Sequence, residues 1–166
     1  MSNLSDLLER FRRGAELVAV TMTGAAGSEL DFTPEPGKWS MRQIVSHLSD
    51  SEILAATRFR RILAEDRPVL EAFNQNAWAT NLDYNKRKTS QALETFRRIR
   101  GENYELLKDL PETAFERTAV HSKLGEVTLL RMLQIFAEHA ENHAQQLRAR
   151  RNEYKQHRAA SAEARS

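Results

Sequence analysis

Four long stretches of the chain carry apolar residues at intervals of three and four, and no stretch sustains an alternation of apolar and polar residues. Such spacing gathers the apolar side chains on one face of an α-helix. Glycine (6) and proline (4), which interrupt helices, are scarce among the 166 residues. A chain of this length forms one domain with a core of its own. We therefore predict an all-α protein in which four helices pack into a single bundle.

Capping and breaking residues indicate where these helices begin and end. Two prolines and a glycine within residues 33–38 interrupt the chain after the first helix. Ser40, followed by Gln43 three residues later, has the pattern of a capping box at a helix start. Pro68 and Pro111 follow the second and third helices. The predicted helices span about residues 4–22, 40–65, 89–110 and 126–151.

Two long connections, residues 67–88 and 112–125, separate the last three helices. Connections of this length can run from one end of a bundle to the other, so we do not expect an up-down-up-down arrangement. The bundle domain is predicted to cover residues 1–152. The charged segment 153–166 ends in a run rich in alanine, arginine and serine and is predicted to be a disordered tail.

Composition and charge exclude several classes of protein. There is no cysteine, which excludes disulfides, thiolate metal sites and a cysteine nucleophile, and a cytoplasmic location is expected. No apolar run approaches the roughly 18 residues that cross a bilayer, and the first residues lack the apolar core of a signal peptide. The formal net charge is +2, with basic residues concentrated near the C-terminus. We interpret these as a solvated helix end and do not expect nucleic acid binding.

Two histidines lie together at the centre of the apolar face of the last helix. His139 and His143 are about 40° apart on the helical wheel, and their i, i+4 spacing lets two imidazoles share one metal ion. His47 lies within the apolar stripe of the second helix, where a hydrogen-bonded core histidine and a third ligand both fit the pattern. The remaining histidines, His121 in a connection and His157 in the tail, are predicted to face solvent.

The residues around these histidines exclude two familiar metal sites. The segment His139-Ala140-Glu141-Asn142-His143 lacks the glutamate of the H-E-x-x-H metalloprotease motif. Neither histidine follows a glutamate by three residues, as the ligands of a di-iron bundle do. These exclusions leave a site for one ion on His139 and His143, with a third ligand from another helix.

Three polar residues near the histidines are candidates for a supporting role. Asp50, three residues after His47, and Asn142, beside His143, could each orient an imidazole. The alternative is that both are ordinary polar residues on a helix flank. Arg58 lies on the same helix face as His47 and is a candidate for binding an anionic group of a substrate.

Several short motifs follow one another between about residues 5 and 150. They are Pro36-Gly37-Lys38-Trp39-Ser40, Ile44-Val45-Ser46-His47-Leu48, Phe73-Asn74, Trp78, Tyr84, Gly125-Glu126-Val127-Thr128-Leu129, and His139 with His143 followed by Gln146-Leu147. In this order they resemble the DinB/YfiT-like superfamily of metal-binding four-helix proteins. The resemblance implies an up-up-down-down bundle with a long crossover connection, often a homodimer. It also implies that His47, His139 and His143 bind zinc, nickel or a similar divalent ion, with iron or manganese as alternatives.

The chemistry expected of such a site begins with an open coordination position. Three imidazoles on one divalent ion leave room for water or for a thiol, whose pKa the ion would lower. Members of the superfamily include transferases that use low-molecular-weight thiols, and a chain without cysteine would need such a thiol as a cosubstrate. The first hypothesis is therefore a metal-dependent transferase that attacks a small electrophilic substrate. The alternatives are a metal-dependent hydrolase and a non-catalytic module that the ion only stabilises.

Overall fold

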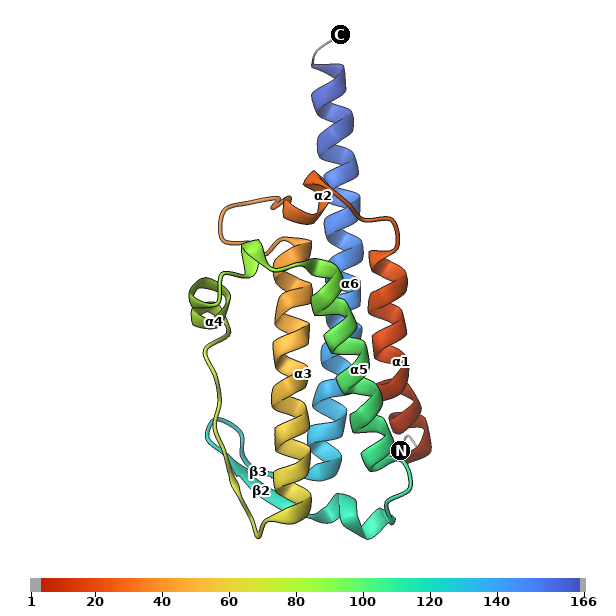
Figure 1. The fold of residues 1–166 in the computed structure, drawn as a ribbon, viewed down its shortest axis with the longest axis vertical. Helices are drawn as coiled ribbons and strands as arrows, with labels where there is room; N and C mark the ends of the chain where they lie inside the picture. Colours follow the sequence, from red (N-terminus) through yellow and green to blue (C-terminus); the bar gives the residue numbers. More distant parts are fainter. Residues whose placement is uncertain (1–3, 165–166) are drawn as a thin grey trace.

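The predicted apolar stretches fold as helices in the computed structural model, which describes residues 4–164. Within this part of the chain, four long helices form a bundle, and short helices and a small sheet occupy the connections (Figure 1). The prediction of an all-α four-helix bundle is confirmed. Residues 1–3 of the predicted domain and 165–166 of the predicted tail lie outside the described residues. The long helices are α1 (Leu4–Met22), α3 (Met41–Ala64), α5 (Thr89–Leu107) and α6 (Leu129–Glu163).

The predicted capping box fixes the start of α3. Ser40 Oγ accepts a hydrogen bond from the Gln43 N–H at 3.3 Å, and the Gln43 side-chain oxygen accepts one from the Ser40 N–H at 2.9 Å. This reciprocal cap satisfies two amides that lie outside the hydrogen-bond ladder of the helix. It therefore sets the helical register in which His47, two turns later, faces the bundle interior.

Helices α1 and α6 run in one direction, and α3 and α5 run in the other (Figure 1). Contacts at two levels of the bundle show that α1 and α6 are parallel: Arg10 pairs with Glu141 at 2.7 Å, and Arg151 donates to the Thr21 carbonyl at 2.9 Å. The order of directions along the chain is therefore up-down-down-up. This finding corrects the up-up-down-down order that the resemblance implied.

The paths of the connections explain this order. The first connection contains the short helix α2 (Ser28–Asp31) and returns the chain at the end of the bundle where α1 stops. The predicted crossover, between α3 and α5, instead runs the full length of the bundle (Figure 1). It contains strand β1 (Val69–Leu70), helix α4 (Gln75–Asn81) and the 3₁₀ turn η1 (Tyr84–Lys86). As a result α3 and α5 are parallel.

A small sheet at one end of the bundle was not predicted. Strand β1 pairs in parallel with β2 (Thr118–His121), which pairs antiparallel with β3 (Gly125–Thr128), and a 3₁₀ turn η2 (Glu112–Glu116) precedes them. Strands of two to four residues are too short to show a two-residue alternation. Because β3 takes up Glu126, α6 begins at Leu129, with Thr128 Oγ capping the Arg131 N–H at 3.1 Å.

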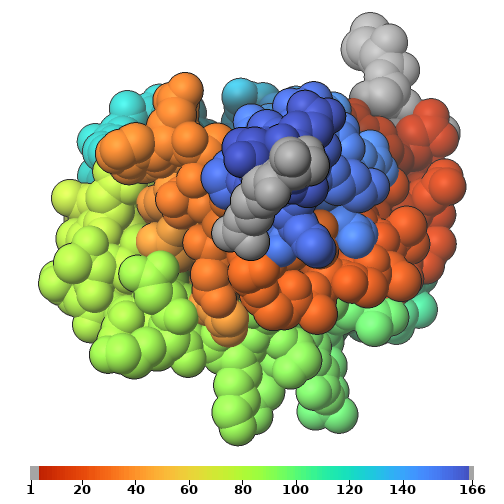
Figure 2. Space-filling view, turned by 90° about the horizontal axis from the view of Figure 1, so that it is seen from above, coloured from red at the N-terminus to blue at the C-terminus, as the bar shows by residue number. Residues whose placement is uncertain are grey.

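Helix α6 continues well beyond the predicted end. Residues 153–163, expected to be disordered, are helical, because they are rich in helix-forming residues and contain neither glycine nor proline. The Tyr154 and Ser28 hydroxyl groups lie 2.6 Å apart, and the Tyr154 ring contacts Phe32 at 5.5 Å. The segment that contains α2 thus supports this end of α6 (Figure 2). No helix in the described part of the chain is long and apolar enough to cross a membrane.

A buried ion pair lies inside the bundle. Arg100 of α5 donates two hydrogen bonds to the Glu52 carboxylate of α3, at 2.9 and 2.7 Å, and both side chains are 1% exposed. Arg100 also donates to the main-chain carbonyls of Phe11 in α1, at 2.8 Å, and Phe136 in α6, at 3.2 Å. Asn103 adds a third hydrogen bond to Glu52, at 3.0 Å. One guanidinium therefore links all four long helices.

We expect Gly14→Ala to destabilise the protein. A methyl group at Gly14 would lie 2.8 Å from the Ala140 Cβ and 3.0 Å from the Arg100 Nη1, and such overpacking costs about 1–3 kcal/mol. Alanine itself favours a helix by about 1 kcal/mol over glycine, so the matched control Gly101→Ala, which meets no atom within 4 Å, should stabilise. Urea unfolding of both variants measures the two effects. An unfolding free energy of Gly14→Ala equal to that of Gly101→Ala would contradict the close packing of α1.

Candidate metal centre

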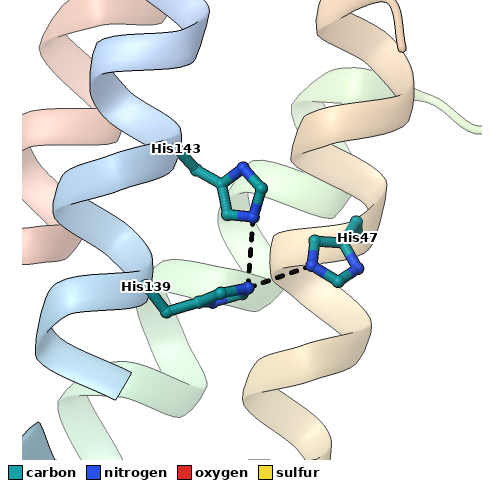
Figure 3. Close-up of side chains that lie close together, drawn as sticks. All are labelled: His47, His139 and His143. Atoms are coloured by element: carbon teal, nitrogen blue, oxygen red, sulfur yellow. Dashed lines mark hydrogen bonds between the residues drawn. The ribbon is translucent and has the colours of Figure 1, made fainter. Parts of the chain in front are cut away.

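The structure brings together the three histidines that the sequence analysis singled out. His47 extends from α3 toward His139 and His143, which lie one turn apart on α6 (Figure 3). The Nε2 atom of His139 is 3.0 Å from the Nε2 of His47 and 3.1 Å from the Nε2 of His143. One nitrogen from each ring lies within 4.8 Å of the other two. Two antiparallel helices thus direct three nitrogen donors at one point.

Burial keeps these histidines neutral. His47 is 2% exposed, and desolvation, followed by the proximity of His143, lowers its pKa to about 4, against the opposing effect of Asp50. Desolvation also lowers the pKa of His139 and of His143. Neutral imidazoles carry the lone pairs that bind metal ions. Near pH 7 the three rings are therefore in the protonation state that a divalent ion requires.

Hydrogen bonding alone does not satisfy all three converging nitrogens. The Nδ1 of His143 lies 2.8 Å from the Gln146 Oε1, which only accepts, so Nδ1 carries the hydrogen and Nε2 carries a lone pair. His139 Nε2 can either donate one hydrogen or accept one, and His143 Nε2 has none to donate, so only one of the two close contacts of His139 can be an ordinary hydrogen bond. The contacts among the three Nε2 atoms therefore lack the hydrogens for two ordinary hydrogen bonds. A cation among them would remove this conflict, and the ligands of a tetrahedral zinc ion lie about 3.3 Å apart. The donor set therefore fits a divalent metal ion.

Replacing Gln146 with leucine is expected to weaken metal binding by about 10–100-fold, the usual effect of removing a hydrogen bond that orients a ligand. The Gln146 amide holds the ring of His143 with its Nε2 directed at the other histidines. The neighbouring Gln145 is exposed, so Gln145→Leu should bind zinc as the wild type does. Competition with a chromogenic chelator measures both affinities. Equal affinities for the two variants would show that Gln146 does not orient the ring.

Acid is expected to destabilise the metal-free protein between about pH 6.5 and 4. In this window the unfolded chain protonates His47, whereas the folded protein, in which the His47 pKa is about 4, does not. The unfolded state therefore binds more protons as the pH falls, and stability declines by up to about 3 kcal/mol from this residue. Urea unfolding at pH 7 and pH 4.5 in a chelator measures the decline. His47→Leu should show a smaller decline, and an equal one would contradict the shifted pKa.

Asp50 supports the crossover rather than an imidazole. Its carboxylate is buried, and it accepts one hydrogen bond from the Tyr84 hydroxyl at 2.7 Å and one from Arg87 Nη1 at 2.6 Å. Burial and the bond to Asp50 raise the pKa of Tyr84, which therefore stays protonated as a donor. This contact joins the crossover to α3 beside the histidines. No hydrogen bond between Asp50 and a histidine is found in residues 4–164, although its charge raises the His47 pKa.

In residues 4–164, neither of the other two candidates hydrogen-bonds to an imidazole of His47, His139 or His143. Asn142 is exposed on α6, and Gln146 takes the orienting position beside His143. The i, i+3 spacing of Gln146 from His143 was the signal that could have identified it in the sequence. Arg58 is half-buried and donates from Nη2 to the Glu71 carbonyl of the crossover at 2.7 Å. Burial lowers its pKa.

The predictions for the remaining histidines had opposite outcomes. His157 is exposed, as predicted, with its ring 5.2 Å from that of Phe32. His121 is only 7% exposed, so its predicted solvent-facing position is wrong. It ends strand β2, and its Nδ1 accepts hydrogen bonds from the Lys123 and Leu124 N–H groups at 3.2 and 3.3 Å. His121 thus stabilises the turn between two strands that the sequence analysis did not predict.

The sequence of this chain is similar to those of known proteins. The family model of the DinB superfamily matches residues 10–147. A candidate metal-dependent hydrolase of Oceanobacillus iheyensis is 29% identical over 127 residues, which cover 76% of this chain and 73% of that protein. The candidate metal-dependent hydrolase YfiT of Bacillus subtilis is 30% identical over 117 residues, covering 70% of this chain and 66% of YfiT.

The fold is also shared with a solved structure. The structure of YfiT from Bacillus subtilis, described as having an unusual four-helix bundle topology, matches with a TM-score of 0.81 at 24% identity. The match covers 90% of this chain and 89% of that chain. The four-helix arrangement found here is therefore that of a known fold.

Proposed function

The chain belongs to the DinB superfamily, and from this membership and the geometry of its histidines we propose that it is a metal-dependent hydrolase. His47, His139 and His143 are the proposed ligands of one divalent ion. The observation that carries the proposal is the convergence of their three Nε2 atoms, at 3.0 and 3.1 Å, with too few hydrogens for hydrogen bonding alone. The relatives named as candidate metal-dependent hydrolases support the same reaction class.

Different residues of the chain would have different roles at such a site. Bound to three neutral imidazoles, a divalent ion supplies a Lewis acid with an open position and a water of lowered pKa. Gln146 fixes the tautomer of His143, and Ser51 Oγ lies 3.4 Å from both ring nitrogens of His47. In hydrolysis the water oxygen bonds to the acyl carbon, the bond to the leaving group breaks, and a proton passes to the leaving group. Arg58 remains our candidate for holding an anionic part of the substrate.

Imidazole donors suit several metals, among them zinc, nickel and iron. We propose zinc or nickel as the physiological ion, because three neutral nitrogens without a carboxylate favour these borderline ions over manganese. The same site could activate a thiol instead of water. The experiment on function must therefore separate hydrolysis from thiol transfer.

Metal-loaded protein incubated with a panel of nitrophenyl esters and anilides tests the proposal. We expect release of nitrophenol or nitroaniline without any thiol, and loss of that release in His143→Ala. A parallel incubation contains 2-mercaptoethanol and the electrophile 1-chloro-2,4-dinitrobenzene. No hydrolysis across the panel, together with metal-dependent conjugation of the thiol, would overturn the hydrolase in favour of a thiol transferase.

A further inference from the structure

Two partly exposed aromatic side chains border His47, and a third packs against one of them. Trp39 lies just before α3, with its ring centroid 5.0 Å from that of His47. Phe73, on the crossover, stacks on His47 at 6.2 Å with 24° between the ring planes, and Trp78 contacts Phe73 at 4.8 Å. We call Trp39, Phe73 and Trp78 the aromatic wall. The aromatic wall therefore forms an apolar surface next to the metal centre.

The aromatic wall differs from the aromatic residues of the core. Phe59 and Phe96 are 0% exposed, whereas all three rings of the wall are only half-buried. Large aromatic groups that remain accessible beside converging polar groups are characteristic of small-molecule sites. The faces and edges of such rings favour contact with another flat apolar group. Since the wall contains no charged side chain, its chemistry selects for apolar ligands.

The chain holds the Trp39 part of the wall in place from α6. Arg150 Nε donates to the Trp39 carbonyl at 2.7 Å, and Arg150 is itself buried, with 6% of the residue exposed. Ser40, the next residue, belongs to the capping box of α3. The position of Trp39 relative to His47 is therefore set by two helices.

The crossover is fixed to α3 on both sides of Phe73 and Trp78. On one side Arg61 donates to the Val69 carbonyl at 2.7 Å, together with the bond from Arg58 described above. On the other side Asp50 holds Tyr84 and Arg87. Between these points the Asn74 side chain caps α4 by accepting from the Asn76 and Ala77 N–H groups at 3.1 and 3.0 Å. Both rings are thus preorganised beside the histidines before any ligand arrives.

We infer that the aromatic wall binds a flat, apolar group of the substrate, so that the protein acts on aryl or arylalkyl esters or amides in preference to short aliphatic ones. The preference among esters and amides rests on the proposed function. The binding of a flat, apolar group to the aromatic wall does not depend on it. A carboxylate that mimics the product of hydrolysis would place its charged end toward the metal centre and its ring against the wall. Phenylacetate and acetate differ only in that ring.

Calorimetric titration of the zinc-loaded protein with phenylacetate and with acetate tests the inference. We expect phenylacetate to bind roughly tenfold more tightly. Phe73→Leu and Trp78→Leu should each bring the two affinities closer together. Phe32→Leu, which removes a half-buried aromatic ring packed against Tyr154 far along α6, should leave the preference unchanged. Helical circular dichroism and zinc content, measured for each variant, establish that fold and metal site are intact.

Equal affinities of the wild type for the two carboxylates would overturn the inference, as would a preference that both wall variants retain. Failure of the inference can be distinguished from failure of the proposed function. A preference for phenylacetate without hydrolysis of any ester would overturn the proposed function and support the binding inference. Hydrolysis of acetyl and phenylacetyl esters with equal KM, alongside equal affinities for the two carboxylates, would leave the function standing and overturn the inference.

Discussion

Replacing His139 with alanine is expected to abolish stable metal binding and, with it, metal-dependent hydrolysis. His139 is the central donor, because its Nε2 lies 3.0 Å from that of His47 and 3.1 Å from that of His143. Its loss leaves two donors on different helices, so the affinity should fall by well over the roughly 100-fold that loss of an orienting residue causes. Titration with zinc against a chelator measures the affinity, and ester hydrolysis measures the activity.

The control for this substitution lies on the same helix. His157 of α6 is exposed and far along the chain from the trio, so His157→Ala should keep both zinc affinity and activity. Circular dichroism of His139→Ala in a chelator should match that of the wild type, because alanine favours a helix. Full zinc affinity in folded His139→Ala would contradict the proposed ligand set.

Glu52→Ala is expected to lower the unfolding free energy by about 3–5 kcal/mol, the usual effect of leaving a buried charge without its partner. Both Glu52 and Arg100 are 1% exposed, and the Arg100 guanidinium makes two hydrogen bonds to the carboxylate. Removal of Glu52 would leave Arg100 charged among the rings of Phe11 and Phe96, 4.0 and 5.0 Å away. Urea unfolding at pH 7 measures the loss.

An exposed ion pair between neighbouring helices provides the control. Glu16 and Arg97 pair at 3.1 Å with side chains 58% and 51% exposed, so Glu16→Ala should cost less than about 1 kcal/mol. The double variant Glu52→Leu with Arg100→Met should be less destabilised than Glu52→Ala, because no isolated charge remains in the core. Equal losses for Glu52→Ala and Glu16→Ala would contradict a role of the buried pair in holding the four helices together.

Local signals predicted the helices, and non-local contacts explain what was missed. The span of α1 and the capped start of α3 follow from apolar spacing and from Ser40 with Gln43, which act within a few residues. Helix directions depend on how each connection packs, and strand β1 depends on pairing across about fifty residues, Val69 with Val120. Neither has a local sequence pattern.

In the candidate site, too, local signals predicted some features, and features that depend on non-local contacts were missed. Periodicity placed His139 and His143 on one buried face and His47 on another, and the structure brings the three together. Glu52 and Arg100 escaped prediction because charged residues near an apolar stripe ordinarily face solvent. Asp50 was one candidate for orienting an imidazole, but its partners lie on the crossover, more than thirty residues away.

Metal analysis of protein purified without a nickel column tests the central claim most directly. Protein dialysed against a zinc or nickel salt and then freed of excess ion should retain about one ion per chain. A matched variant with all three histidines replaced by alanine should retain none under the same treatment. Wild-type protein that retains no ion, or a triple variant that retains as much as the wild type, would contradict a metal centre formed by His47, His139 and His143.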